Sequence, residues 1–235
     1  MGLFSHKEAI RLPSRDIHNH LLPGVDDGFR HKGSSLEAIR RLADNGCREL
    51  VLTPHKNPEI YNTDEAFLRE RFAAFVQEVP AEWGVKMALA AEYMIVPGFE
   101  ARAADPELLT YEDGSILIEM SYYYRSENLE RTVFELALAG RKPILAHPER
   151  YIYMAETLHD FNRLADQGCR FQMNWMSLTG TYGEGSLRIL RYLLENDMYS
   201  FICTDLHTVQ QLGSILSIRL DRKLLRAVDK VLSTY

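Results

Sequence analysis

The chain alternates between short apolar segments and longer amphipathic segments. Seven apolar runs rich in β-branched residues predict β-strands. The expected strands cover residues 15–21, 50–55, 85–94, 115–121, 143–147, 170–176 and 200–207. Apolar residues at helical spacing predict helices over residues 34–45, 64–79, 128–139, 156–166, 185–196 and 212–232. Because strand and helix alternate along the chain, we expect a parallel α/β fold.

A ten-residue pattern occurs twice where a helix is expected to end. RLADNGCREL at residues 41–50 returns as RLADQGCRFQ at residues 163–172. Gly46 and Gly168 each supply the residue that most readily takes the left-handed conformation ending a helix. A helix-to-strand corner used twice is typical of an α/β chain built from repeated units.

Two parallel architectures fit this pattern, an open doubly wound sheet and a closed or nearly closed barrel. The sequence after the first expected strand has no Gly-x-Gly-x-x-Gly, which disfavours a dinucleotide-binding open sheet. A barrel would gather its chemistry at the carboxyl ends of its strands. Residues 15–235 are expected to form one domain, preceded by an N-terminal extension over residues 1–14.

Composition narrows the possible partners and the expected location. The formal net charge of -6 and the lack of a basic block argue against nucleic acid as a partner. Three cysteines without a Cys-x-x-Cys spacing fit a reducing compartment. No apolar run is long enough for a membrane span, and the N-terminus is a poor signal peptide. We therefore expect a cytoplasmic protein without membrane insertion.

Titratable residues gather where the strands are expected to end. Five of the eight histidines lie there, namely His18, His20, His55, His147 and His207. Three carboxylates interrupt apolar strands, namely Glu92, Glu119 and Asp205. A carboxylate in such a strand is costly unless it is paired, hydrogen-bonded or bound to a metal.

Spacing supports a metal cluster. His18 and His20, like Asp205 and His207, are two residues apart, so both members of each pair face one side of a strand. Nitrogen and carboxylate ligands without thiolates suit manganese, iron or zinc, and their number implies more than one ion. One buried histidine alone would more often be a hydrogen-bonded core residue. The Asp26–Asp27–Gly28 segment alone would be a turn.

Six motifs together resemble the PHP (polymerase and histidinol phosphatase) superfamily. In chain order they are DIHNH, TPH, AEY, IEMS, AHPERY and TDLH, between Asp16 and His207. HLLPGVDDG and AHPERY resemble in particular the bacterial capsule-operon protein-tyrosine phosphatases of the CpsB/YwqE type. The resemblance implies a distorted (β/α)7 barrel, similar to a TIM barrel, with three divalent metal ions, manganese first and iron or zinc as alternatives.

The resemblance also implies a role for each motif residue. One ion would be held by His18, His20, Glu92 and Asp205. Glu92 would share a second ion with Glu119 and His147, and a third would bind Asp27, His55 and His207. Asp26 stays open as the alternative to Asp27, because a shift of one residue in the loop would exchange them.

Substrate contacts follow the motifs less completely. Arg150 of AHPERY matches the family arginine that contacts the substrate phosphate. The family often has another arginine shortly after the final Asp-x-His, but here no arginine occurs before Arg219. Lys56 and Arg30 are the candidates to replace it.

The expected reaction is hydrolysis of phosphotyrosine on a protein by a hydroxide that bridges metal ions. By resemblance, the substrate would be the tyrosine-rich tail of a cognate bacterial tyrosine kinase in capsular or exopolysaccharide synthesis. A cysteine phosphatase needs Cys-x5-Arg, but Thr53, Trp175 and Val209 stand at the arginine positions. No general acid is assigned, because a phenolate with a pKa of about 10 leaves with little help.

Three alternatives stay open. Another PHP phosphoesterase would act on histidinol phosphate or on nucleotides. A metal-dependent amidohydrolase would share the first His-x-His, but it normally needs a lysine at a strand end, and the expected strand ends have none. A non-enzymatic binding module is disfavoured by the complete ligand set. The aromatic segments at residues 121–125 and 149–154 would contact the phosphotyrosine ring, or else cover the barrel mouth or an oligomer contact.

Overall fold

The computed structural model describes residues 7–61 and 63–233. It confirms a parallel α/β fold, in which every strand of the two larger sheets pairs in parallel with its neighbours. One sheet has the order β2-β3-β5, and its strands are β2 (Arg15–Asp16), β3 (Glu49–Leu52) and β5 (Lys86–Leu89). The other has the order β10-β9-β8-β7-β6-β4, and its strands are β4 (His55–Lys56), β6 (Glu92–Met94), β7 (Ser115–Glu119), β8 (Lys142–Ala146), β9 (Arg170–Asn174) and β10 (Tyr199–Cys203).

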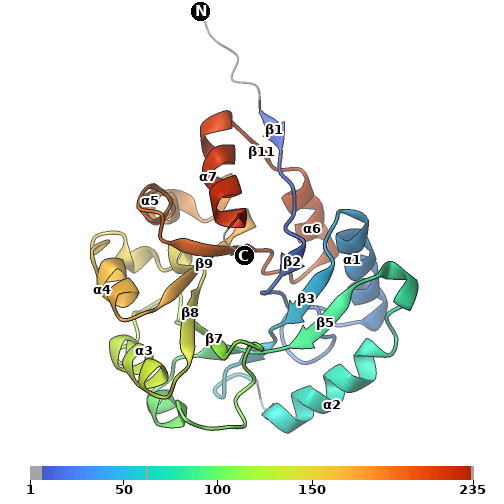
Figure 1. The fold of residues 1–235 in the computed structure, drawn as a ribbon, viewed down its shortest axis with the longest axis horizontal. Helices are drawn as coiled ribbons and strands as arrows, with labels where there is room; N and C mark the ends of the chain where they lie inside the picture. Colours follow the sequence, from blue (N-terminus) through green and yellow to red (C-terminus); the bar gives the residue numbers. More distant parts are fainter. Residues whose placement is uncertain (1–6, 62, 234–235) are drawn as a thin grey trace, which may run out of the picture.

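Helices lie outside the strands, which run around a common centre (Figure 1). The α-helices are α1 (Lys32–Asp44), α2 (Glu65–Val76), α3 (Leu129–Leu138), α4 (Asp160–Asp166), α5 (Gly183–Glu195), α6 (Val209–Leu216) and α7 (Arg222–Leu232). The 3-10 helices are η1 (Ala81–Trp83), η2 (Phe99–Arg102), η3 (Pro148–Arg150), η4 (Ile152–Met154) and η5 (Trp175–Thr179). The helix expected over residues 156–166 begins only at Asp160.

The repeated helix-to-strand corner has the expected conformation. Gly46 and Gly168 have φ angles of 96° and 86°, in the left-handed region. After each glycine, the next main-chain N–H turns back to the helix: Cys47 donates to Leu42 and Cys169 to Leu164, both at 3.0 Å. The corner therefore ends two helices in the same way and directs the chain into β3 and β9.

Two of the expected strands are each divided between the two sheets. The segment at residues 50–55 forms β3 and β4 with Pro54 between them, and the segment at residues 85–94 forms β5 and β6. Hydrogen bonds still cross this division, from Ala90 N–H to the Leu52 carbonyl at 2.9 Å and from Glu92 N–H to the Pro54 carbonyl at 3.1 Å. Proline has no N–H to donate, so the regular ladder is interrupted there.

The segments that follow β2 and β10 also join. Asp205 N–H donates to the His18 carbonyl at 2.8 Å, and His20 N–H donates to the Leu206 carbonyl at 3.0 Å. These bonds lie beyond the regular strands, around an isolated bridge between Asn19 and Leu206. The two larger sheets are thus linked by hydrogen bonds, and the expected closed seven-stranded barrel is not confirmed as one continuous sheet.

The prediction of one helix over residues 212–232 is wrong. The segment forms two helices, α6 and α7, separated by β11 (Arg219–Leu220). That strand pairs antiparallel with β1 (Glu8–Ala9), so part of the expected N-terminal extension lies against the C-terminal region. The Asp221 carboxylate then accepts a hydrogen bond from Leu224 N–H at 2.9 Å and starts α7 as its N-cap.

The strands bury side chains on both faces. On β7, Ile116 and Ile118 belong to the larger core cluster between strands and helices, whereas Leu117 belongs to a smaller cluster. That smaller cluster contains Ile17, Val51, Ala90, Tyr111, Leu117, Ile144, Ala146, Phe201 and Cys203. Burial on both faces is typical of parallel strands. Beyond this inner cluster, at the carboxyl ends of the strands, the buried residues become histidines and carboxylates.

Candidate metal centre

Seven of the nine expected ligands lie at the carboxyl end of a strand or in the segment that follows it, whereas His55 and Glu92 are the first residues of β4 and β6, which continue β3 and β5. Their ligand atoms form four overlapping groups, in each of which the atoms lie within 4.8 Å of one another. The groups are His20–Asp27–His55–His207, His18–His20–Asp205, His18–Glu92–His147 and His55–Glu92–Glu119. Residues far apart in the sequence thus converge on one small volume.

The first expected ligand set is brought together. The Nε2 atom of His18 lies 3.3 Å from Glu92 Oε2 and 3.5 Å from Asp205 Oδ1. The Nε2 atom of His20 lies 3.4 Å from the same two oxygens. All four side chains are buried. Two imidazole nitrogens and two carboxylates therefore face one point.

The set expected around Asp27 also meets. Asp27 Oδ1 lies 3.4 Å from His55 Nε2 and 3.7 Å from His207 Nε2. His20 belongs to this group as well, because its ring stacks on that of His207 with centroids 4.0 Å apart. His20 therefore lies between two groups.

The remaining set is arranged differently from the expectation. Besides His18 and His20, Glu92 contacts two further histidines, with Oε1 3.0 Å from His147 Nε2 and Oε2 3.0 Å from His55 Nδ1. Glu119 Oε1 lies 2.9 Å from His55 Nδ1. Glu119 and His147, expected on one ion, thus fall into different groups that share Glu92. The central position of Glu92 fits a bridging ligand.

Hydrogen bonds orient three of the histidines. His18 Nδ1 donates to Gln172 Oε1 at 2.7 Å, and His20 Nδ1 donates to Asp26 Oδ2 at 2.8 Å. His207 Nδ1 donates to the main-chain carbonyl of Asp205 at 2.9 Å. An acceptor at Nδ1 fixes the proton there and leaves the Nε2 lone pair toward the cluster. Gln172 and Asp26 thus support the cluster without belonging to its groups.

The two loop aspartates have different surroundings. The Asp26 side chain is buried and also accepts from the N–H groups of His55 at 3.0 Å and Gly28 at 2.9 Å. The Asp27 side chain is 59% exposed and faces His55 and His207. A Cβ atom at Gly28 would lie 2.4 Å from the His20 carbonyl oxygen, so only glycine fits this turn. Asp26 therefore contacts His20 at Nδ1, the ring nitrogen that does not face the cluster, whereas Asp27 faces the ligand atoms of His55 and His207.

Electrostatics and unsatisfied atoms fit a set of divalent cations. Burial alone would raise the pKa of Glu92 and Asp205, but His18 and its neighbours hold both well below the usual range. Burial and the charge of Glu92 raise the pKa of Glu119. The buried ligand atoms Glu92 Oε2, His55 Nδ1 and His147 Nδ1 form no hydrogen bond with the described part of the chain. Nitrogen and oxygen donors without thiolates are the ligands of manganese, iron or zinc.

Backbone strain coincides with two of these residues. His147 and Asp205 are non-glycine residues with positive φ angles, 32° and 47°. Such a conformation costs about 1–3 kcal/mol for each residue and persists where the surroundings hold it. At Asp205 the side chain is held by Asn174 Nδ2, which donates to Oδ2 at 2.7 Å. Both residues are thereby turned toward the cluster.

Arg150 lies beside the cluster on η3. Its Nη1 donates to Asp205 Oδ2 at 3.3 Å. The guanidinium lies over the Tyr122 ring and also faces the Tyr182 ring. Stacked guanidinium groups keep their in-plane N–H donors available for an anion. The sequence singled out Arg150 but gave no indication of Tyr182, which precedes α5 in a loop.

Lys56 is held away from the cluster. Its ammonium donates to the Thr63 carbonyl and lies 3.7 Å from Glu65 Oε2. The expected role of Lys56 in phosphate binding would require it to leave these partners, and that role stays a prediction. Arg30, the other candidate, is exposed.

A cavity of about 720 Å³ opens at the cluster. Asp27, His55 and Glu119 line it together with residues from the segments 57–61, 94–97 and 121–128. The aromatic segment at residues 121–125 thus lies at the cavity, as expected. Its tyrosines differ, however: Tyr122 packs against Arg150, whereas Tyr123 is 91% exposed.

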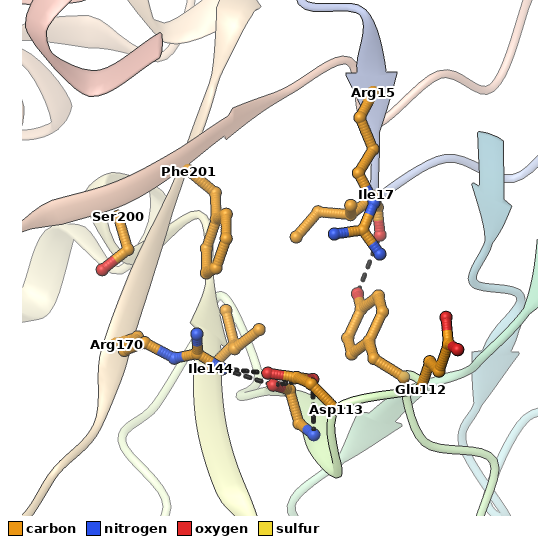
Figure 2. A pocket seen from close by; sticks show the side chains of 10 residues that line it. Arg15, Ile17, Glu112, Asp113, Ile144, Arg170, Ser200 and Phe201 are labelled. Atoms are coloured by element: carbon orange, nitrogen blue, oxygen red, sulfur yellow. Dashed lines mark hydrogen bonds and ion pairs between the residues drawn. The ribbon is translucent and has the colours of Figure 1, made fainter. Parts of the chain in front are cut away.

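A second cavity, of about 510 Å³, lies at the opposite ends of the strands (Figure 2). Three of its charged side chains are paired: Arg15 lies 2.8 Å from Glu49, and Arg170 lies 3.7 Å from Asp113 and donates to Ser115. None of the nine expected ligands lines it. The titratable cluster and its cavity are therefore confined to the carboxyl ends, where parallel α/β folds place their sites.

The cysteines are poor nucleophiles. Cys47, Cys169 and Cys203 are buried and free. Burial raises the pKa of the Cys47 and Cys169 thiols to about 12, so they stay protonated at neutral pH. This agrees with the missing Cys-x5-Arg motif.

No helix in the described part of the chain is long and apolar enough to cross a bilayer.

Comparisons with known proteins agree on one group. The family model for capsular polysaccharide synthesis, CpsB/CapC, matches residues 14–215. Tyrosine-protein phosphatase YwqE of Bacillus subtilis (strain 168) is 29% identical over 197 residues, covering 83% of this chain and 78% of YwqE. Tyrosine-protein phosphatase CpsB of Streptococcus pneumoniae is 27% identical over 202 residues, covering 83% of each chain.

Solved structures give the same picture. A crystal structure from work on YwqE of Bacillus subtilis and CpsB of Streptococcus pneumoniae, described as unique metal-dependent tyrosine phosphatases, has a TM-score of 0.76 and 27% identity and covers 94% of each chain. A putative histidinol phosphatase from Listeria monocytogenes has a TM-score of 0.56 at 13% identity, covering 85% of this chain and 97% of its own. The latter likeness concerns the fold alone.

Proposed function

Because this chain belongs to the CpsB/CapC family of capsular polysaccharide synthesis, we propose that it is a metal-dependent protein-tyrosine phosphatase. One observation carries the proposal: all nine histidines and carboxylates expected as ligands converge on one small volume, in four overlapping groups. Arg150 lies beside them and donates from Nη1 to Asp205 Oδ2. An anionic substrate would meet metal cations and an arginine together.

The fold proposed for this function is a distorted (β/α)7 barrel. The hydrogen bonds of His18 and His20 with Asp205 and Leu206 support closure between the first and last strands. Closure matters for the site, because it brings the His-x-His motif at residues 18–20 beside the Asp-x-His motif at residues 205–207.

We assign the cluster to three divalent ions, with manganese as the first candidate. His18, His20, Glu92 and Asp205 would hold one ion, and Asp27, His55 and His207 another, with His20 near both. Glu92 would share the third with Glu119 and His147, although these two lie in different groups of the protein alone. When bound, such ions lower the pKa of water and supply a hydroxide nucleophile at neutral pH.

The chain's own residues would bind and orient the phosphate. Arg150 would donate its free in-plane N–H groups to the non-bridging oxygens, and its charge would stabilise the negative charge of the transition state. Gln172 and Asp26 would keep His18 and His20 in the tautomer with a free Nε2. The leaving phenolate has a pKa of about 10, so the reaction needs no strong general acid.

The proposed partner is a phosphotyrosine protein, in particular the tyrosine-rich tail of a cognate bacterial tyrosine kinase. Relatives named tyrosine-protein phosphatase and the family's link to capsular polysaccharide synthesis support this choice. Such a kinase tail would place the enzyme in the cytoplasm.

A substrate panel tests the proposal. The manganese-loaded full chain should hydrolyse a phosphotyrosine peptide with a higher kcat/KM than the matching phosphoserine peptide, histidinol phosphate or a nucleoside monophosphate. Arg150→Ala is the comparison variant and should lose activity on every phosphate ester. A higher kcat/KM for histidinol phosphate or a nucleotide would assign another phosphoesterase activity, and hydrolysis of amides alone would assign an amidohydrolase.

A further inference from the structure

The mouth of the large cavity exposes apolar side chains to an unusual degree. Ile60 is 68% exposed, Tyr123 91% and Tyr124 63%. All three line the cavity that leads to His55 and Asp27. Clustered apolar exposure around a cavity is a common mark of a binding surface.

The two segments that carry these apolar side chains, residues 57–61 and 121–128, also carry negative charge. Glu59 precedes Ile60, Glu127 follows the tyrosines, and both glutamates are exposed and line the cavity. Among the described residues that line the cavity, the one lysine or arginine is Arg125. Its guanidinium is bound to Glu130 and Asp160, so its charge is neutralised. We call Glu59, Ile60, Tyr123, Tyr124 and Glu127 the rim.

We propose that the rim docks the substrate chain on either side of the phosphotyrosine and selects apolar, aromatic and basic neighbours over acidic ones. The inference rests on the proposed phosphatase function and adds the sequence preference of its substrate. Apolar neighbours would cover Ile60, Tyr123 and Tyr124. Basic neighbours would be attracted to Glu59 and Glu127, whereas acidic neighbours would be repelled.

The position of the rim favours a substrate over a second copy of the chain. Asp27, His55 and Glu119 line the same cavity as the rim. A protein that covered the rim permanently would also close access to these three residues. A segment that enters with its phosphotyrosine and leaves after hydrolysis covers the rim only during turnover.

The test uses three phosphotyrosine peptides that differ only in the neighbouring positions, which are lysine, alanine or glutamate. Hydrolysis of p-nitrophenyl phosphate, which has no neighbours, reports the chemistry alone. With the manganese-loaded full chain at low salt, kcat/KM should rank lysine above alanine above glutamate. The lysine-to-glutamate ratio should be about 2- to 30-fold, as expected for two exposed charge pairs, and should fall at high salt.

Two double variants complete the test. Glu59→Gln/Glu127→Gln should bring the lysine-to-glutamate ratio close to unity. The matched control Glu70→Gln/Glu195→Gln removes the same charge from exposed positions that do not line the cavity, and it should keep the ratio.

The outcomes separate the rim proposal from the phosphatase function. If the wild type hydrolyses p-nitrophenyl phosphate but has an equal kcat/KM for the lysine and glutamate peptides, or a higher one for the glutamate peptide, the rim proposal is wrong. If it hydrolyses neither, the phosphatase function itself fails. A dimer that dissociates when Tyr123 and Tyr124 are changed to serine would assign the rim to self-association instead.

Discussion

The guanidinium carbon of Arg150 lies 4.0 Å from the centroid of the Tyr122 ring. Tyr182 faces the same guanidinium, with its ring centroid 4.8 Å away. The two rings come from different parts of the chain and lie against the arginine while its Nη1 contacts Asp205. This arrangement fixes the plane of the group that we assign to phosphate binding.

Replacement of Tyr182 should therefore weaken substrate binding. Tyr182→Leu should raise KM for a phosphotyrosine peptide by about 2- to 30-fold with little change in kcat, because an aromatic face contributes about 0.5–2 kcal/mol to a guanidinium. Tyr182→Phe keeps the ring and should keep KM. Tyr192→Leu, on α5, is the matched control. In the Arg150→Ala background, where activity is expected to be lost, the affinity for the phosphotyrosine peptide is measured by direct binding. Tyr182→Leu should not weaken that affinity further, and an equal loss of affinity there would show that the tyrosine acts independently of Arg150.

Loss of the Gln172 amide should weaken metal binding. Gln172 Oε1 accepts from His18 Nδ1 and from His147 N–H, at 2.7 and 3.3 Å. Gln172→Leu leaves both donors without this acceptor, and an outer partner of this kind changes metal affinity by about 10- to 100-fold. Competition with a chromogenic chelator measures the affinity. Gln167→Leu, at an exposed helix end, is the control. An unchanged metal affinity in Gln172→Leu would show that the hydrogen bond from His18 to Gln172 does not support metal binding.

The two loop aspartates should respond differently to amidation. Asp27→Asn removes a charge from an exposed side chain and should lower the number of bound ions with little loss of stability without metal. Asp26→Asn weakens the buried hydrogen bonds to His20 and His55 and should lower the free energy of unfolding by about 1–3 kcal/mol. Metal analysis and urea unfolding measure the two effects. The reverse result would make Asp26 the ligand.

Metal binding should release protons near neutral pH. Burial alone would lower the pKa of His20, but Asp26, Asp205 and Glu92 raise it well above the usual value. Glu119 and Glu92 overcome burial in the same way at His55. The raised pKa values favour the protonated form of both rings in the metal-free protein. The stability that this protonation contributes is complete below about pH 6.5 and is lost as the pH rises through the raised pKa values.

Metal affinity should consequently fall as the pH is lowered from about 8 to about 6. Calorimetry of manganese binding in buffers with different ionisation enthalpies measures the released protons directly. A binding enthalpy that does not depend on the buffer would contradict the protonated state that we infer for His20 and His55.

Much of the cluster could be predicted because its signal is local. Glu92, Glu119 and Asp205 stand out as carboxylates in apolar strands, and parallel strands bring their carboxyl ends to one edge. The supporting residues carry a weaker signal. Gln172 stands two residues before Asn174 on an apolar strand, but its partner His18 is distant in sequence, so the pair is visible only after folding. Tyr182 lies in a loop without periodicity.

The fold was predictable in its alternation and less so in its details. Repeated glycine corners at Gly46 and Gly168 mark real helix ends. The segments at residues 50–55 and 85–94 were each expected as one strand, but each is divided between the two larger sheets. Hydrophobic periodicity does not report this division, which occurs at Pro54 in the first segment. The single helix expected over residues 212–232 failed because Asp221 caps a new helix and β11 pairs with a segment from the other end of the chain.

Metal content measured together with activity tests the central claim most directly. Protein purified without chelator should contain about three divalent ions per chain. Treatment with EDTA should remove the ions and abolish hydrolysis of a phosphotyrosine peptide, and manganese should restore it. Full activity with fewer than two ions per chain, or activity that survives complete metal removal, would contradict the account.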